Sequence, residues 1–112
     1  MPKLEIPAGM LDKVKKLVEE KKNFSYENLD DFIGKSFFIR TVTYHLVGKI
    51  EKRLGKFFQL SGASWVADSG RFMQAIKDGT LDEVEPVGVA ILNIDSITDM
   101  FPWNHKLPTE QK

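Results

Sequence analysis

The stretch from residue 36 to residue 67 consists of short runs rich in apolar residues, with turn residues between them. Residues 36–43, 45–53, 57–60 and 63–67 are rich in aromatic and β-branched residues, a composition typical of strands. Leu54-Gly55-Lys56 is typical of a hairpin turn, and Ser61-Gly62 indicates a second turn. Gly48 lies inside the second run, where glycine usually marks a bulge or a sharp bend. The pattern predicts four consecutive antiparallel strands that curl at Gly48.

A helix is expected directly after the fourth of these strands. Asp68 or Ser69 is a suitable N-cap, and Gly79 is a suitable end. The helical spacing places Phe72, Ala75 and Ile76 on its inner face. We then expect a linker over residues 81–85, an apolar strand over 87–92, a short strand or turn over 96–101, and an extended tail over 102–112.

The N-terminal part of the chain has a helical spacing of apolar residues. These residues follow the i, i+3, i+4, i+7 rule, with Lys and Glu between them: Met10, Leu11, Val14, Leu17 and Val18. The pattern predicts an amphipathic helix from about residue 8 to residue 22. Residues 23–34 indicate a short helix or helical turn that ends at Gly34.

Together these elements predict an α+β protein with a small bent antiparallel β-barrel of about five strands. An N-terminal amphipathic helix precedes the barrel, and one helix follows the fourth strand. A length of 112 residues fits a single domain. We divide it into a helical extension (1–35), the barrel with its inserted helix (36–101) and the tail (102–112).

Charge is distributed unevenly, although the formal net charge is zero. Residues 36–60 hold five basic residues against one acidic residue, whereas residues 61–112 hold four basic residues against eight acidic ones. The basic stretch favours either a polyanion-binding face or neutralisation by the acidic half, within one chain or across a subunit interface. The sequence has no cysteine, which excludes disulfides and thiolate chemistry, and no apolar run of about 18 residues, so we expect no membrane association.

The segment Asp68-Ser69-Gly70-Arg71 is a candidate ligand site. The N–H groups of a first helical turn, together with Arg71, could hold a phosphate, and Trp65 could stack on a base. The alternative is structural: Asp68 or Ser69 caps the helix, Trp65 belongs to the core, and Arg71 pairs with an acidic neighbour.

A second group of candidates, Arg40, Tyr44 and His45, lies near the first strand turn and could form a rim that contacts a ligand. His45 among apolar residues is equally typical of a structural histidine. The two histidines have no metal-binding spacing, and the chain has no nucleophile, phosphate-loop or dinucleotide motif. We therefore expect a protein that is not an enzyme and that uses no metal or cofactor.

The run FIRTVTYHLVGKI…FQLSGASWVADSGRFMQAIKDGTLDEVEP…ILNIDSITDMFPWNHKLP resembles small uncharacterised proteins of bacteriophages and prophages, over about residues 37–108. This resemblance implies a phage context and the host cytoplasm, and it supplies no catalytic residues. The order of strand, glycine, strand, turn and strand also resembles Sm-like and SH3-like small barrels. That second resemblance implies a bent five-stranded sheet that associates through its edges.

Three functions are compatible with these observations. The first is a phage protein that binds a nucleotide-like anionic ligand and sequesters an immune second messenger of the host. The second is a structural or assembly protein of the virion. The third is a small barrel that binds RNA or DNA through Arg40, Lys49, Lys52 and Arg53. In each case we expect the chain to form a homo-oligomer.

Overall fold

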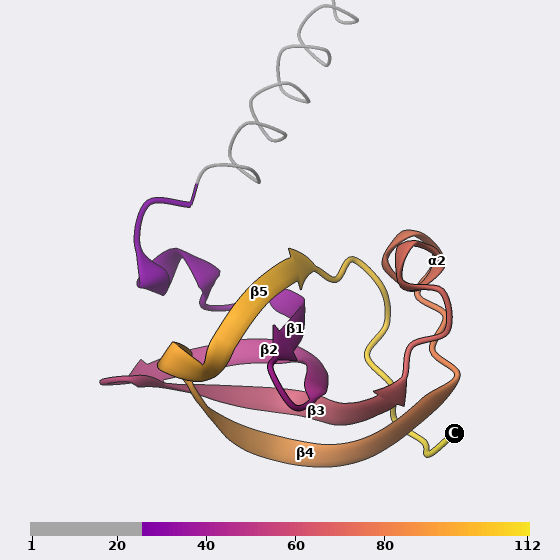
Figure 1. The fold of residues 1–112 in the computed structure, drawn as a ribbon. Coiled ribbons are helices and arrows are strands. Elements are labelled where there is room, and N and C mark those ends of the chain that lie inside the picture. Colours follow the sequence, from indigo (N-terminus) through magenta and orange to yellow (C-terminus); the bar gives the residue numbers. More distant parts are fainter. Residues whose placement is uncertain (1–25) are drawn as a thin grey trace, which may run out of the picture. The chain divides into compact units, whose positions relative to one another are not determined.

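The computed structural model describes residues 26–112 of the chain. The helix expected over residues 8–22 lies outside the described residues. Phe32–Lys112 form one compact unit. Its elements are the end of a 3₁₀ turn η1 (Leu29–Phe32), β1 (Ser36–Thr41), β2 (His45–Leu54), β3 (Phe57–Asp68), α2 (Phe72–Asp78), β4 (Glu83–Asn93), a 3₁₀ turn η2 (Ile94–Ser96) and β5 (Ile97–Pro102) (Figure 1).

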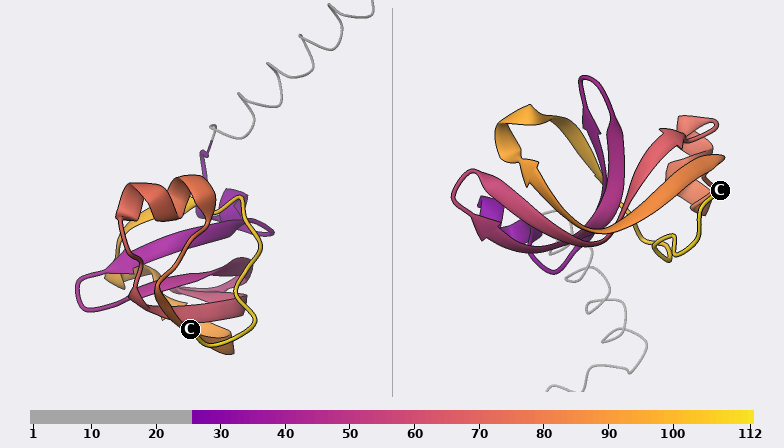
Figure 2. Two further views of the ribbon diagram at one scale, coloured as in Figure 1. Left: turned by 90° about the vertical axis from the view of Figure 1, so that its right-hand side faces the viewer. Right: turned by 90° about the horizontal axis from the view of Figure 1, so that it is seen from below.

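The five strands form one antiparallel sheet in the order β4-β3-β2-β1-β5. Figure 2 shows that this sheet is strongly bent, with α2 and the tail on one side of it. The small antiparallel five-stranded sheet with a helix is therefore confirmed, but the protein is mostly β. The predicted bent barrel is present only as a bent sheet and is not closed, because β4 and β5 stay at opposite edges of the sheet and do not pair. Within the described residues, β5 has β1 as its one partner strand, and five of its six residues are register partners of β1 residues.

The third and fourth predicted strands are one continuous strand, β3, so the expected turn at Ser61-Gly62 is wrong. In the pairing of β3 with β4, Leu60 is opposite Ala90 and Ala63 is opposite Gly88. The segment between Leu60 and Ala63 therefore contains one residue more than the facing segment of β4, which is a β-bulge. Gly62 supplies the left-handed conformation that the bulge needs, with φ of 56°. Since β3 does not end here, α2 follows the third strand and not the fourth.

The predicted bend at Gly48 is confirmed by the pairing of β2 with β3, whose register shifts between Val47 and Lys49. Gly48 is buried and lies opposite the bulge of β3. A Cβ atom at Gly48 would lie 3.1 Å from the Cα of Ala63. Glycine therefore allows the two backbones to approach each other where both strands bend.

The helix α2 ends as predicted and begins differently. Gly79 ends it with φ of 75°, and its N–H donates to the carbonyl of Ala75. The N-cap position is occupied by Arg71, whose side chain makes no capping hydrogen bond. The prediction of Asp68 or Ser69 as the cap is wrong, because the carboxylate of Asp68 instead accepts a hydrogen bond from the N–H of Gly70 before the helix begins.

The helix and the tail cover one face of the sheet and bury a compact cluster of side chains. This cluster contains Phe38, Val47, Val66, Ala75, Leu81, Val84 and Trp103, with Phe72, Ile76 and Leu107 packed against it. The predicted inner face of α2 is thus confirmed. Phe37 and Ile39 alternate with Phe38 along β1 and are also fully buried, so β1 is covered on both faces.

The tail after β5 is extended, as expected, and packs closely through every second residue. Trp103 is 3% exposed and lies beside Phe38, with 6.1 Å between ring centroids. The Nε2 atom of His105 lies 2.7 Å from the carbonyl oxygen of Ile76, near the end of α2. Leu107 reaches the bulge, because a Cβ at Gly62 would lie 3.0 Å from its Cδ1. The tail therefore connects β1, α2 and β3.

Candidate functional site

Arg40 is held in place by an acidic side chain and two aromatic rings. Its Nε and Nη2 atoms donate to the two carboxylate oxygens of Asp99 at 2.7 and 2.5 Å. Its guanidinium carbon lies 4.6 Å from the ring centre of Phe72 and 5.1 Å from that of Phe101. The hydrogen bond from Arg40 lowers the pKa of Asp99; partial burial opposes this shift, and the charge of Arg40 adds to it. Two nitrogen atoms of Arg40 that could donate to a ligand thus already donate to Asp99.

His45 and Tyr44 lie next to Arg40, as expected from the sequence. His45 is the register partner of Arg40, and its ring centre lies 5.6 Å from that of Phe38. The backbone carbonyl of Tyr44 accepts hydrogen bonds from the N–H and the hydroxyl of Thr41. Tyr44 itself is 38% exposed. The structure therefore assembles the predicted rim of Arg40, Tyr44 and His45, and its arginine is already paired.

The loop before α2 brings together Asp68, Ser69, Gly70 and Arg71. The hydroxyl of Ser69 donates to the carbonyl of Gly70, and Arg71 is exposed. A carboxylate also lies against this loop, since a Cβ at Gly70 would lie 2.9 Å from an oxygen of Asp82. With Asp68 and Asp82 both beside it, the loop is less favourable to an anion than the sequence suggested. Because α2 has seven residues, its dipole is also short.

Trp65 lies apart from the predicted rim. Its register partner on β2 is Leu46, whereas the partner of His45 on β3 is Val66. Neighbouring residues of a strand point to opposite faces, so Trp65 and His45 lie on opposite faces of the sheet. The predicted ligand residues thus separate into the rim, the loop before α2, and Trp65 on the other face.

The basic residues predicted to contact a nucleic acid are partly engaged by acidic ones. Lys49 lies 3.6 Å from the carboxylate of Glu51, which also accepts a hydrogen bond from Ser61. The hydrogen bond from Ser61 and the charge of Lys49 lower the pKa of Glu51. Arg53 donates to the carbonyl of Gly55 in the β2–β3 turn. With Arg40 also paired, Lys52 is the member of the predicted set for which no such partner is seen in the described part of the chain.

The most unusual surface feature is a row of apolar side chains that the sequence did not lead us to expect. Four side chains share the outer face at one end of β2, β3 and β4, and we call them the β4 patch: Leu54, Phe57, Val89 and Ile91. Their exposed fractions are 46%, 43%, 65% and 60%. Leu54 is the register partner of Phe57, and Ile91 is the partner of Gln59. Clustered apolar exposure of this kind usually marks an interaction surface.

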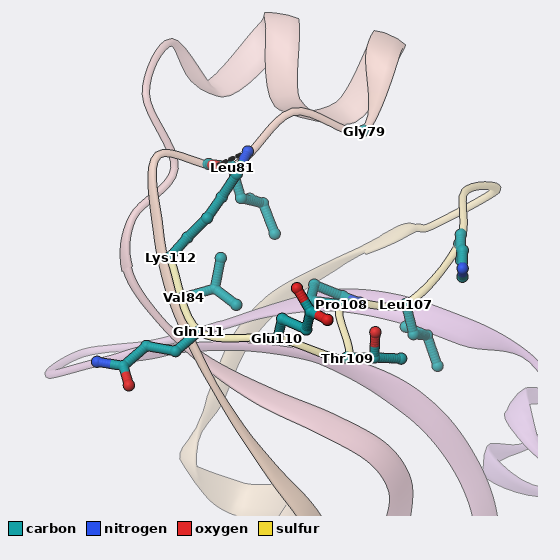
Figure 3. A pocket seen from close by; sticks show the side chains of 10 residues that line it. Gly79, Leu81, Val84, Leu107, Pro108, Thr109, Glu110, Gln111 and Lys112 are labelled. Carbon is teal, nitrogen blue, oxygen red and sulfur yellow. Dashed lines mark hydrogen bonds between the residues drawn. The ribbon is translucent and has the colours of Figure 1, made fainter.

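A small cavity of about 310 Å³ lies beneath the end of the tail (Figure 3). Leu81, Val84 and Leu107 give it an apolar lining, and residues 108–112 form much of its wall. The backbone of Lys112 exchanges two hydrogen bonds with Val84, of 2.9 and 3.2 Å, and its Nζ donates to the carbonyl of Leu81. The volume is at the lower limit for small-molecule pockets, and none of the predicted site residues lines it.

The sequence pattern did not indicate Asp99, Phe72 and Phe101 as partners of Arg40, and it did not indicate the β4 patch. The run Val87–Leu92 was expected to be a strand, and it is part of β4, but a continuous apolar run usually indicates burial. The glycine at position 88 was the one available sign of an unusual strand.

No three acidic or histidine side chains within residues 26–112 lie close enough together to hold a metal ion. In the same residues, we find no helix with the length and apolar character needed to span a membrane.

No protein-family model matches the chain, and no curated protein matches it. The resemblances to phage proteins and to Sm-like barrels therefore stay predictions.

Proposed function

We propose that this protein is a non-enzymatic assembly protein that associates with further copies of itself through the β4 patch. The observation that carries this proposal is the exposure of Val89 and Ile91, at 65% and 60%, on an edge strand of the sheet. Burying such side chains in an interface contributes roughly 1.5–3 kcal/mol for each one that becomes fully covered. The assembly role corresponds to the structural or virion function considered from the sequence, with phage origin as part of the proposal.

The arrangement of the patch supports an interface more than a small-molecule site. Phe57 and Leu54 extend the apolar surface from β4 across the β2–β3 turn. Lys52 is the register partner of Gln59, which is in turn the partner of Ile91, so polar side chains border the patch on the side of β2. An apolar centre with a polar rim is typical of protein interfaces. The small-barrel resemblance, a prediction from the sequence, would imply association through sheet edges, and β4 is an edge strand.

Nucleotide binding and nucleic-acid binding receive less support from the geometry. Arg40 is bound to Asp99 in two places, and the loop before α2 has the carboxylates of Asp68 and Asp82 beside it. Trp65 lies on the opposite sheet face from His45. A phosphate would have to displace these pairs, whereas a protein partner can contact the β4 patch as it stands.

The test is the mass of the protein in solution. Light scattering on the full chain over a concentration range should give a mass above 12.8 kDa that rises with concentration. Ile91→Lys should bring the mass down to that of one chain, because the ammonium group would have to be desolvated in the interface. Val42→Lys is the matched control, since Val42 is 91% exposed but lies in the β1–β2 turn, outside the patch.

Two results would overturn the proposal. One is a wild-type mass near 12.8 kDa at every concentration up to several hundred micromolar. The other is an equal loss of association in the variants at positions 42 and 91. Circular dichroism of Ile91→Lys should show a folded spectrum and a cooperative thermal transition, so that dissociation is not a result of unfolding; its midpoint is compared with that of wild type at a concentration where wild type is dissociated.

A further inference from the structure

We infer that two copies pair through their β4 strands, antiparallel, with the two-fold axis passing beside Ile91. This inference rests on the proposed function and specifies its geometry. The inference rests on the backbone N–H and carbonyl groups of β4. Some of them already form hydrogen bonds, and others point away from the sheet. In Figure 1, β4 runs along the lower side of the sheet, and within the described residues β3 is the one strand that pairs with it.

The first half of β4 is closed to a further strand. The N–H and carbonyl of Val84 both bond to the backbone of Lys112, so they point away from β3. Outward and inward positions alternate along an antiparallel strand, and Pro86 is therefore the next outward residue. Proline has no N–H to donate, which is a common way to protect a sheet edge. The tail and Pro86 together exclude pairing over residues 83–86.

Within residues 26–112, no strand or tail residue pairs with the outer edge of the second half of β4. The N–H of Ile94 donates to the carbonyl of Lys56, which makes Phe57 and Asn93 a pair without mutual hydrogen bonds. By alternation the backbone groups of Asn93, Ile91 and Val89 point away from β3. In the first half of β4 the even-numbered residues Val84 and Pro86 point away from β3, whereas in the second half the odd-numbered residues do. The register shift between Ala63 and Ser64 accounts for this change. The open segment thus has three outward residues, and Ile91 is the central one.

A second copy of β4 is the occupant that fits this segment. A two-fold axis beside Ile91 places each Ile91 opposite its own copy and each Val89 opposite Asn93. All three outward positions are then used, and Pro86 and Lys112 are left outside the pairing. Residues 87–94 have no charged side chain, so no like charges face each other when the segment meets itself.

The other edge of the sheet is a poorer partner for this segment. β5 has six residues, ends at Pro102 and contains the charged Asp99. Ring contact between Phe101 and Phe72 of α2 also brings the helix close to this edge, with 4.9 Å between centroids. Pairing β4 with β5 of another copy would therefore place proline and a carboxylate against a neutral apolar strand.

Cysteine cross-linking tests the register, since the natural sequence has no cysteine. In a hydrogen-bonded antiparallel pair the Cα atoms are about 5.5 Å apart, within the range that a disulfide spans. Ile91→Cys should give a covalent dimer under mild oxidation, and Val42→Cys should not. Val89→Cys alone should also fail, because its own copy lies four residues along the strand, roughly 13 Å away. A mixture of Val89→Cys and Asn93→Cys should form the mixed dimer.

The outcomes separate this inference from the proposed function. If wild type is a monomer by light scattering, both are wrong. If wild type associates but Ile91→Cys does not cross-link, the function stands and the two-fold register is wrong. Preferential cross-linking of Ala90→Cys would place the axis one residue away and also overturn the register. Reduced Ile91→Cys must retain the wild-type thermal midpoint for the comparison to hold.

Discussion

Arg40 and Asp99 join β1 to β5 through two hydrogen bonds between register partners that are 59 residues apart in the sequence. The guanidinium also contacts the rings of Phe72 and Phe101. One side chain thus connects the edge strand β5 to the first residue of α2. Both members of the pair are about one third exposed, so solvent weakens their attraction, and the two-point geometry compensates in part.

We expect Arg40→Met to lower the melting temperature by roughly 3–6 °C, through loss of both hydrogen bonds and both ring contacts. Arg40→Lys should recover less than half of this loss, because an ammonium group cannot form the two parallel hydrogen bonds. Thermal melts by circular dichroism measure the effect. Full recovery by lysine would show that charge alone, and not the fork of two donors, stabilises this contact.

The same pair predicts a pH dependence of stability. The hydrogen bonds from Arg40 lower the pKa of Asp99 below its ordinary value of 3.8. In acid the unfolded chain therefore takes up this proton before the folded chain does, so the contribution of Asp99 is present above about pH 4 and is lost as the pH falls further. Urea unfolding of wild type and Asp99→Asn from pH 7 to pH 2.5 should show a stability difference that shrinks only below pH 4. A difference that is constant with pH would contradict this origin.

The local elements could be predicted from the sequence, but their partners could not. The phasing of Phe37 and Phe38 on opposite faces, the bend at Gly48 and the end of α2 at Gly79 all follow from residues close together in the chain. The pairing of Arg40 with Asp99 depends on which strand lies beside β1, which no local pattern encodes. The exposure of Ile91 has the same cause, since it depends on β4 being at an edge.

The bulge of β3 was mistaken for a turn because both require the same residues. Ser61-Gly62 offers a left-handed glycine between two apolar runs, which fits a tight hairpin turn as well as an inserted residue in a continuous strand. The difference is decided by the facing strands: β4 continues past the insertion and pairs with β3 on both sides of it. The number of strands and the position of α2 after the third strand follow from this one distinction.

Because of the bulge, we expect substitutions of Gly62 to differ in how much they lower the free energy of unfolding. Gly62→Ala should cost about 1–2 kcal/mol, because its φ of 56° is unfavourable for a residue with a Cβ. Gly62→Asn should cost less, since asparagine accepts the left-handed region more readily. Both variants place a Cβ 3.0 Å from the Cδ1 of Leu107, and the asparagine carboxamide adds further atoms there, so the two are compared in a Leu107→Ala background to isolate the backbone effect. Chemical denaturation gives the free energies, and equal losses in the two variants would contradict the assignment.

Substitution of Arg71 tests whether the loop before α2 has a structural role or binds a ligand. It is exposed and makes no capping hydrogen bond, so Arg71→Ala should leave the melting temperature within about 1–2 °C of wild type. If a nucleotide binds at this loop, Arg71→Ala should remove its stabilising effect, and Asp82→Asn should increase that effect by removing a nearby negative charge. Thermal-shift measurements with cyclic dinucleotides and ADP-ribose test this. A large loss of stability in Arg71→Ala without ligand would indicate a structural role instead.

The burial of Trp103 indicates that the tail contributes to the free energy of unfolding. It is 3% exposed and packs beside Phe38, and its indole N–H has no hydrogen-bond partner among the described residues. Trp103→Ala should therefore cost about 3–5 kcal/mol, as expected for a large cavity in the core. Trp103→Phe should cost only about 1–2 kcal/mol, because it keeps most of the ring contact and breaks no hydrogen bond within residues 26–112.

Urea denaturation of both variants measures this difference, with Trp65 as the remaining fluorophore. Trp65→Phe is the matched control, since Trp65 is 39% exposed and should cost under about 1 kcal/mol. If Trp103→Phe is as damaging as Trp103→Ala, the indole N–H has a partner, such as a buried water, whose loss is costly. If neither variant loses stability, the tail is not part of the core, and its contacts with α2 and with the bulge of β3 do not stabilise the fold.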